Sequence, residues 1–370
     1  MKTILVILGT RPEAIKLAPV ILELKKHTQF RVLVCNTEQQ KELSNQTLSF
    51  FGIQADFKLN VMRPSQTLAG VQARILTALS EVYEQGNIDA TIVQGDTMTV
   101  FCGALVSFYN KVPVYHVEAG LRSCDLFEPF PEEAMRQMTA RITDLHFAPT
   151  GKAAEALKNE GIAPERVVLT GNTVIDALSC LSADTMEVAE QKLEAMGVKL
   201  NDKLVLITAH RRENHGERLD RILSAICDLT AAYPDHQFVL PVHPNPNVHD
   251  KVYLALDSKT NVILTAPMDY PELVCMMKHT KLVLTDSGGI QEEAPTFGNP
   301  VLVMRYETER TEGVEAGFAK LVGADKELIL KECSAILNQD KASTRLDGSK
   351  NPYGDGQAAK YIVNAIRKQL

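Results

Sequence analysis

The sequence predicts an α/β protein made of two doubly wound parallel-sheet domains that face a cleft. Three observations predict this fold class. Short apolar runs rich in Val, Ile and Leu recur along the chain, amphipathic helical segments separate them, and 370 residues suffice for two domains. The runs lack polar alternation, which is typical of parallel strands covered by helices on both faces.

The strands are expected at the apolar runs, in chain order: 4–9, 31–36, 90–95, 112–117, 145–148, 166–170, 203–208, 237–242, 261–265, 281–285 and 300–304. The first strand leads into a helix, because Thr10 and Glu13 have capping-box spacing and Pro12 stands in the first helical turn. Helical patterns follow the later strands as well.

A polar helical segment separates the two strand-rich halves of the chain. The turn NPYGDG at 351–356 then precedes a last amphipathic helix at 357–369. We predict an N-terminal domain at 1–171, on which the C-terminal helix at 355–370 packs, and a C-terminal domain at 172–354.

Polar residues stand where the predicted strands end: Thr10, Asp96, Glu118, Asn172, His210, His243, Asp286 and Arg305. In open α/β sheets, ligands bind outside the carboxyl ends of the strands. These positions are therefore expected to line one cleft.

The stretch LVLTDSGGIQEE at 282–293 has the pattern of an anion site. A strand runs into Ser287, Gly288 and Gly289 and then into a helix, whose free N–H groups and dipole favour a phosphate. The simpler alternative is an N-cap with a tight turn. Glu293 would lie within reach of a ribose hydroxyl.

Cations support the anion-site reading in both halves. Arg11 and Lys16 stand at a helix N-terminus, where the dipole disfavours them unless an anion is present. His210 adjoins Arg211 and Arg212 at a strand end, which suits a diphosphate.

Three acids, Asp96, Glu118 and Glu132, follow strands or open helices in the first half. Taken singly they read as caps or solvated acids, but together they suit proton transfer.

Composition excludes several classes of protein. The net charge of -7, without a Lys/Arg block, argues against a nucleic-acid surface. The seven widely spaced cysteines without a C-x-x-C pair suggest neither a disulfide framework nor a zinc site, and no apolar run reaches membrane-spanning length. A cytoplasmic protein is expected. The G-x-G-x-x-G, Walker-A and H-E-x-x-H motifs are missing, which disfavours nicotinamide or flavin binding, phosphoryl transfer and zinc hydrolysis.

Several motifs occur in the order of one known family: GTRPEAIK (9–16), QGDT (94–97), HVEAGLR (116–122), PEEAMR (131–136), TGNTVIDAL (170–178), AHRREN (209–214), LTDSGGIQEEAP (284–295) and NPYGDG (351–356). The sequence resembles the non-hydrolysing bacterial UDP-N-acetylglucosamine 2-epimerases over nearly its whole length. The resemblance implies two Rossmann-like domains in a glycosyltransferase-B-like fold and a homodimer.

The resemblance also implies a reaction. UDP-GlcNAc and UDP-ManNAc would interconvert by elimination and re-addition of UDP through a 2-acetamidoglucal, for cell-surface polysaccharide synthesis, with no redox cofactor or metal. The residues that match the family's acid/base carboxylates are Asp96, Glu118 and Glu132, with their division of labour open. The residues that match its substrate contacts are Arg11, Lys16, Arg136, His210, Ser287, Gly288, Gly289, Glu293 and Arg310.

Two departures concern the family's activator site, where many members bind a second UDP-GlcNAc. Gln40 replaces a His of the family pattern, and Ser65 replaces an Arg. The candidate allosteric residues in this chain are Gln39, Gln40, Gln46 and Arg212, and activation is left open.

Two alternatives also stay open. A retaining UDP-sugar glycosyltransferase of the same architecture would need an acceptor and would leave the acid trio without an evident purpose. A catalytically silent UDP-sugar sensor would bind tightly without turnover.

Overall fold

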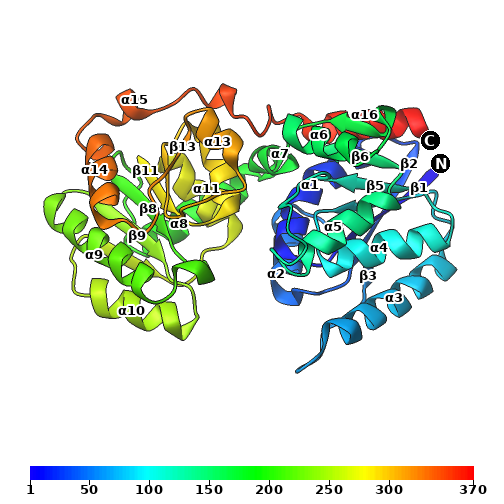
Figure 1. The fold of residues 1–370 in the computed structure, drawn as a ribbon, viewed down its shortest axis with the longest axis horizontal. Coiled ribbons are helices and arrows are strands. Elements are labelled where there is room, and N and C mark those ends of the chain that lie inside the picture. Colours follow the sequence, from blue (N-terminus) through cyan, green and yellow to red (C-terminus); the bar gives the residue numbers. More distant parts are fainter. The chain divides into compact units, whose positions relative to one another are not determined.

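The computed structural model describes residues 1–370, apart from the side chain of Arg212. The chain forms two compact units (Figure 1). Unit 1 comprises Met1–Cys180 and Tyr353–Leu370, and unit 2 comprises Leu181–Pro352. The boundaries predicted from the sequence, after residues 171 and 354, differ from these divisions after Cys180 and Pro352. Each unit carries one wholly parallel sheet between helices, so the predicted fold class is confirmed.

Unit 1 has a seven-stranded parallel sheet in the order β3-β2-β1-β4-β5-β6-β7. Its strands are β1 Lys2–Leu8, β2 Phe30–Asn36, β3 Phe57–Lys58, β4 Ala90–Gln94, β5 Val114–Val117, β6 Leu145–Ala148 and β7 Val167–Leu169. The order reverses between β1 and β4, and ligands of doubly wound sheets bind outside the carboxyl ends of the strands at such a point.

Helices cover both faces of this sheet. They are α1 Arg11–Lys25, α2 Lys41–Phe50, α3 Leu68–Gln85, α4 Met98–Tyr109, α5 Glu132–Arg141, α6 Gly151–Asn159, α7 Thr173–Cys180 and α16 Ala358–Gln369, with the 3-10 turn η1 Pro164–Arg166. Leu5 and Ile7 pack with α3 and α4. Ile4 and Val6, fully buried, point to the other face, because strand side chains alternate.

The last helix, α16, belongs to unit 1 and contacts α1 and α7. Asp176 of α7 accepts hydrogen bonds from the backbone N–H groups of Ala358 at 3.2 Å and Ala359 at 2.8 Å. These bonds satisfy two N–H groups that the first turn of a helix otherwise leaves unpaired. The C-terminal segment is thus held at its first residues as well as by its apolar face.

Unit 2 has a six-stranded parallel sheet in the order β10-β9-β8-β11-β12-β13. Its strands are β8 Leu204–Thr208, β9 Gln237–Pro241, β10 Val262–Thr265, β11 Leu282–Thr285, β12 Val301–Val303 and β13 Ala319–Leu321. Its helices are α8 Ala183–Ala195, α9 Glu217–Ala232, α10 Pro246–Leu256, α11 Tyr270–His279, α12 Gly288–Glu293, α13 Thr311–Glu315, α14 Lys326–Leu337 and α15 Lys341–Thr344, with the 3-10 turns η2 Arg212–Asn214, η3 Ala294–Phe297 and η4 Gly348–Lys350.

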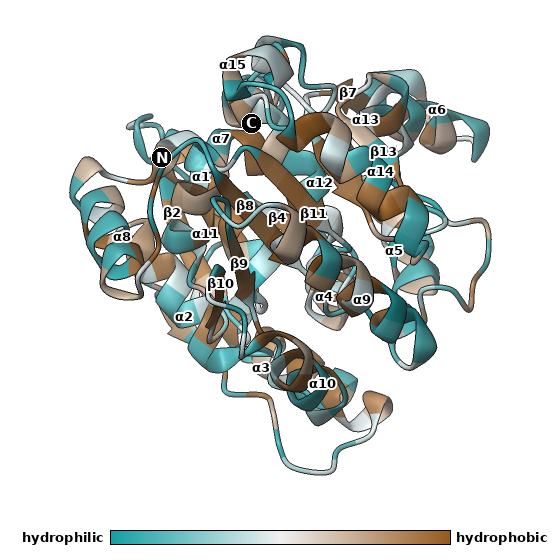
Figure 2. Ribbon diagram, turned by 90° about the vertical axis from the view of Figure 1, so that its left-hand side faces the viewer, coloured by the Kyte–Doolittle hydropathy of each residue, from teal (hydrophilic) through white to brown (hydrophobic). Residues whose placement is uncertain are grey.

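The strands are hydrophobic, and the helices carry both polar and apolar residues. Figure 2 shows this for β8 and β11, which are drawn in brown, whereas helices show both teal and brown. All five residues of β8 and all four of β11 are buried. No helix among the described residues combines the length and the hydropathy that crossing a bilayer requires.

Candidate active site

In unit 1, the turn after β1 is joined to the turn after β4 by one carboxylate. Glu13 Oε2 accepts hydrogen bonds from the backbone N–H groups of Gly9 at 2.6 Å and Thr10 at 3.1 Å. Its Oε1 accepts one from the hydroxyl of Thr97. The capping box predicted from Thr10 and Glu13 is present, and the same carboxylate also fixes the turn that carries Asp96.

Burial raises the pKa of Glu13 to about 7, against the hydrogen bonds from Thr97, Gly9 and Thr10, which lower it. A carboxyl group whose pKa is raised on folding stabilises the fold below its unfolded pKa, and this stabilisation is lost as pH rises through about 7. We therefore expect the unfolding free energy of wild type, minus that of Glu13→Gln, to fall by roughly 3 kcal/mol between about pH 4.5 and 8.

Urea unfolding of both proteins across this pH range measures that difference. Glu81→Gln, which changes an exposed side chain on α3, is the control. A difference between wild type and Glu13→Gln that stays constant from pH 4.5 to 8 would contradict the assignment.

Glu118 follows β5 and is the most enclosed acid of the predicted trio, at 8% exposed. Its Oε1 accepts hydrogen bonds from Lys16 Nζ and, at 3.3 Å, from Asn172 Nδ2. Its Oε2 accepts one from Gln94 Nε2. The residue has φ of 61°, a left-handed conformation that is uncommon outside glycine. Strained backbone of this kind is often found at functional sites.

Asp96, in the turn after β4, is paired with a cation on α5. Its Oδ2 lies 2.5 Å from Arg136 Nη2, and Arg136 Nη1 also lies 3.3 Å from buried Glu133. Glu132 is half-buried at the first residue of the same helix. The structure thus joins Asp96 to the helix that begins at Glu132.

The turn that carries Asp96 also lies close to Glu118. A Cβ atom placed on Gly95 would lie 4.0 Å from Glu118 Oε2. His116 of β5 lies with its Nε2 atom 2.7 Å from the carbonyl oxygen of Gly95. Burial lowers the pKa of His116 to about 4, so its ring is neutral at pH 7. The turn that bears Asp96 and the Glu118 carboxylate therefore lie together at the ends of the neighbouring strands β4 and β5.

Two of the candidate allosteric residues, Gln39 and Gln40, lie close to the turn that begins α1. Gln40 Oε1 accepts a hydrogen bond from the backbone N–H of Arg11 at 2.9 Å, and Gln39 Oε1 accepts one from Thr99 Oγ1 at 3.0 Å. Gln46 is exposed on α2. The side chain of Arg212 lies outside the described part of the chain.

In unit 2, one buried carboxylate holds the turn after β8. Asp286 is fully buried and accepts hydrogen bonds from the backbone N–H groups of His210 at 3.0 Å and Arg211 at 2.9 Å. It accepts a third from Asn214 Nδ2 at 3.0 Å. Its Oδ1 also lies 3.3 Å from His210 Nδ1. The strand-end turns that bear His210 and Ser287 are thereby fixed to each other.

His210 faces a second histidine. Its ring lies nearly parallel to that of His243, with the centroids 6.1 Å apart. Burial lowers the pKa of His210, while Asp286 opposes this shift. A neutral ring held in this way donates to an acceptor without carrying a charge.

The start of α12 has two guanidinium groups beside it. A Cβ on Gly288 would lie 3.2 Å from Arg310 Cζ and 3.5 Å from Arg211 Nη2, so glycine permits this close approach. Arg310 Nε donates to Glu292 at 2.9 Å. Cations near a helix N-terminus oppose the helix dipole, and an anion there removes the conflict.

The other predicted residues of this segment lie within α12 or at its start. Ser287 is the N-cap, and its backbone N–H donates to Thr285 Oγ1 at 2.9 Å. A Cβ on Gly289 would meet no atom within 4 Å among the described residues, and Glu293 is buried. The predicted strand, turn and helix start are thus present at 282–293.

Sequence reasoning did not find the positioning role of three residues: Glu13, Gln94 and Asp286. Glu13 was assigned only to a helix cap, and Asp286 only to a strand end. Their reach to other turns depends on tertiary structure, which spacing does not encode.

Comparison with known proteins assigns the family. The sequence model described as UDP-N-acetylglucosamine 2-epimerase matches residues 22–367. The chain belongs to this family. The UDP-N-acetylglucosamine 2-epimerase of Neisseria meningitidis is 44% identical over 369 residues and 99% of both chains. That of Escherichia coli K12 is 43% identical over 98% of both.

Solved structures of the family share the fold. The N. meningitidis UDP-GlcNAc 2-epimerase bound to UDP-GlcNAc superposes with a TM-score of 0.89 at 44% identity, covering 100% of both chains. The Methanocaldococcus jannaschii enzyme, in complex with UDP-GlcNAc and UDP, gives a TM-score of 0.81 at 33% identity, also covering 100% of both.

Proposed function

We propose that this protein interconverts UDP-GlcNAc and UDP-ManNAc by epimerisation at C2, as a non-hydrolysing isomerase. The single observation that carries the proposal is the enclosed carboxylate of Glu118 at the sheet switch point, in a chain whose relatives are named for this activity. A cytoplasmic location and supply of cell-surface polysaccharide are parts of the same proposal.

Binding of UDP is proposed for the domain predicted at 172–354. His210, Ser287, Gly288, Gly289 and Arg310 would hold the pyrophosphate, and Glu293 the ribose. Support comes from Arg310 and Arg211 beside the start of α12, where an anion offsets their charge. Arg11, Lys16 and Arg136 are the other residues proposed to contact the substrate.

The proposed reaction begins with loss of the C2 proton to a carboxylate. The C1–O bond breaks, its electron pair leaves with UDP, and a C1=C2 double bond forms, which gives 2-acetamidoglucal. A carboxylic acid then protonates C2 on the opposite face, and a UDP oxygen re-forms the bond to C1. Asp96, Glu118 and Glu132 are the proposed acid/base groups, and preorganised donors to UDP lower the barrier by several kcal/mol.

The decisive measurement is proton NMR of UDP-GlcNAc with the purified protein in deuterated buffer, without added nicotinamide cofactor. We expect UDP-ManNAc to appear and deuterium to enter C2 of both sugars. Epimerisation that retains hydrogen at C2 would eliminate the proton-transfer mechanism. Sugar transfer to an added acceptor, without exchange at C2, would favour a glycosyltransferase instead.

A homodimer is also part of the proposal. Phe108 and Tyr109, at the end of α4, are 55% and 68% exposed, and Met138 is exposed on neighbouring α5. Large apolar side chains exposed on two helices that contact each other support a surface that another copy covers.

A further inference from the structure

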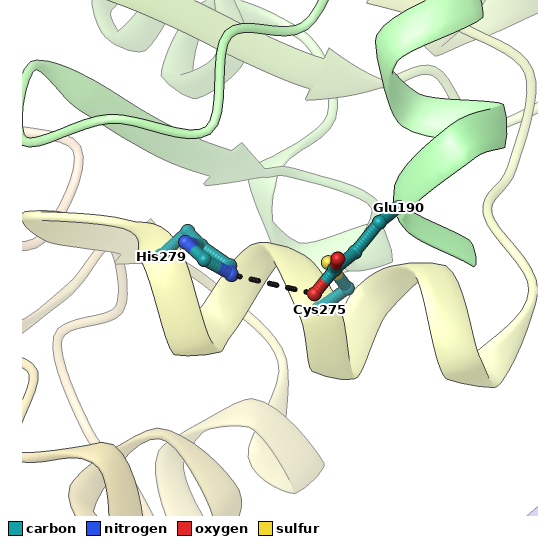
Figure 3. Close-up of side chains that lie close together, drawn as sticks. All are labelled: Glu190, Cys275 and His279. Atoms are coloured by element: carbon teal, nitrogen blue, oxygen red, sulfur yellow. Dashed lines mark ion pairs between the residues drawn. The ribbon is translucent and has the colours of Figure 1, made fainter. Parts of the chain in front are cut away.

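A second set of reactive side chains lies on two packed helices of unit 2. Cys275 and His279 are four residues apart on α11, and Glu190 faces them from α8 (Figure 3). Residues at this spacing share one face of a helix. All three side chains offer metal-binding atoms, and these atoms lie within 4.8 Å of one another.

The distances suit one small cation. In a tetrahedral zinc site, ligand bonds of 2.0–2.3 Å place a nitrogen and an oxygen ligand about 3.4 Å apart, and a nitrogen and a sulfur ligand about 3.6 Å apart. His279 Nε2 and Glu190 Oε1 are 3.8 Å apart in the structure. The observed nitrogen–oxygen separation therefore exceeds the tetrahedral value by only about 0.4 Å.

His279 Nε2 lies 3.8 Å from Glu190 Oε1, which is beyond hydrogen-bond distance. It is buried and makes no hydrogen bond among the described residues. A buried polar atom without a partner is costly, and a bound metal supplies one. His279 is also the last residue of α11, where the carbonyl end of the helix favours a positive charge.

The surrounding charges are balanced. The negative charges of Glu190 and Glu194 interact electrostatically with Cys275. The positive charge of Lys278 interacts with both Cys275 and His279. Lys341 donates to the carbonyl oxygen of His279 at 2.6 Å and lies 3.3 Å from Asp202, so much of its charge is already matched. A thiolate and the Glu190 carboxylate together neutralise a divalent ion.

We propose that Glu190, Cys275 and His279 bind one thiophilic divalent cation of the zinc class, which links α8 to α11. The thiol gives up its proton to solvent when the ion binds, as metal ligation by cysteine requires. Glu190 and His279 are half-buried, so water occupies the fourth position, as in three-ligand zinc sites. None of the three residues is among those proposed for the epimerase reaction.

The test titrates Co²⁺ into full-length, chelator-treated protein and follows the sulfur-to-cobalt charge-transfer absorbance in the near ultraviolet. We expect one equivalent per chain, displaced by Zn²⁺. Cys275→Ser should abolish the band, while His279→Gln and Glu190→Gln should weaken Co²⁺ binding at least about tenfold.

Cys333→Ser is the matched control, because Cys333 is also a buried free thiol of unit 2. It should retain the band. Absence of the band in wild type, or its persistence in Cys275→Ser, overturns the proposal. If Cys275→Ser does not fold, full Co²⁺ affinity in both His279→Gln and Glu190→Gln overturns it equally.

Discussion

Replacing Glu118 by Gln is expected to lower kcat for UDP-ManNAc formation by about 10²- to 10⁴-fold. The variant loses the ability to exchange a proton. It also places an amide N–H₂ against the donors Lys16, Gln94 or Asn172, which all point at the native carboxylate. Initial rates measured by NMR, together with UDP affinity by calorimetry, separate the loss of chemistry from a loss of binding.

Glu38→Gln is the matched control for Glu118→Gln. Glu38 is also a buried acid with left-handed backbone, at φ of 60°, and it follows β2 at the same sheet edge. The kcat of Glu38→Gln should stay within about threefold of wild type, since a change in stability alone leaves the folded enzyme's chemistry unaltered. Equal losses in the two variants would refute a specific role for Glu118.

Replacing Asp286 by Ala is expected to cost about 3–5 kcal/mol of stability in unit 2, because it leaves buried donors without an acceptor. The turn that holds His210 and Arg211 loses the group that fixes it. We therefore expect UDP affinity to fall at least about 100-fold, a loss of about 2.7 kcal/mol. Denaturant unfolding and calorimetric titration with UDP measure the two effects.

Asp286 could affect UDP binding through its negative charge or through the turn that it holds, and the two effects change UDP affinity in opposite directions when the residue is replaced. Removing a negative charge near a phosphate site would by itself strengthen UDP binding, whereas losing the turn weakens it. Asp286→Asn removes the charge and keeps one acceptor oxygen, so it isolates the first effect. Tighter UDP binding by Asp286→Ala than by wild type would show that positioning is not the main role.

Much of the fold could be predicted from apolar periodicity. The runs expected at 90–95 and 281–285 correspond to β4 at Ala90–Gln94 and β11 at Leu282–Thr285. Two strands were missed, β3 and β13. The first has two residues and the second contains exposed Lys320, and both lie at the edge of a sheet. Edge strands pair through the backbone and need little apolar sequence.

The candidate site was predictable as a set of strand-end residues but not as a set of contacts. Glu118 was found from its place after β5, yet its three partners come from positions 16, 94 and 172. The proximity of Glu190 to Cys275 and His279 also could not be predicted from sequence spacing. A search for closely spaced cysteines overlooks a proposed ligand set in which Glu190 comes from another helix.

Unit 1 is built from two chain segments with unit 2 inserted between them, and this affects the order in which the units can fold during synthesis. Unit 1 needs Tyr353–Leu370, whose helix α16 contacts α1 and α7, whereas unit 2 is complete once Pro352 has been synthesised. Domains generally fold as they leave the ribosome, the earliest first. Here the order is inverted: unit 2 can close once Pro352 has been made, whereas unit 1 still lacks Tyr353–Leu370 at that point.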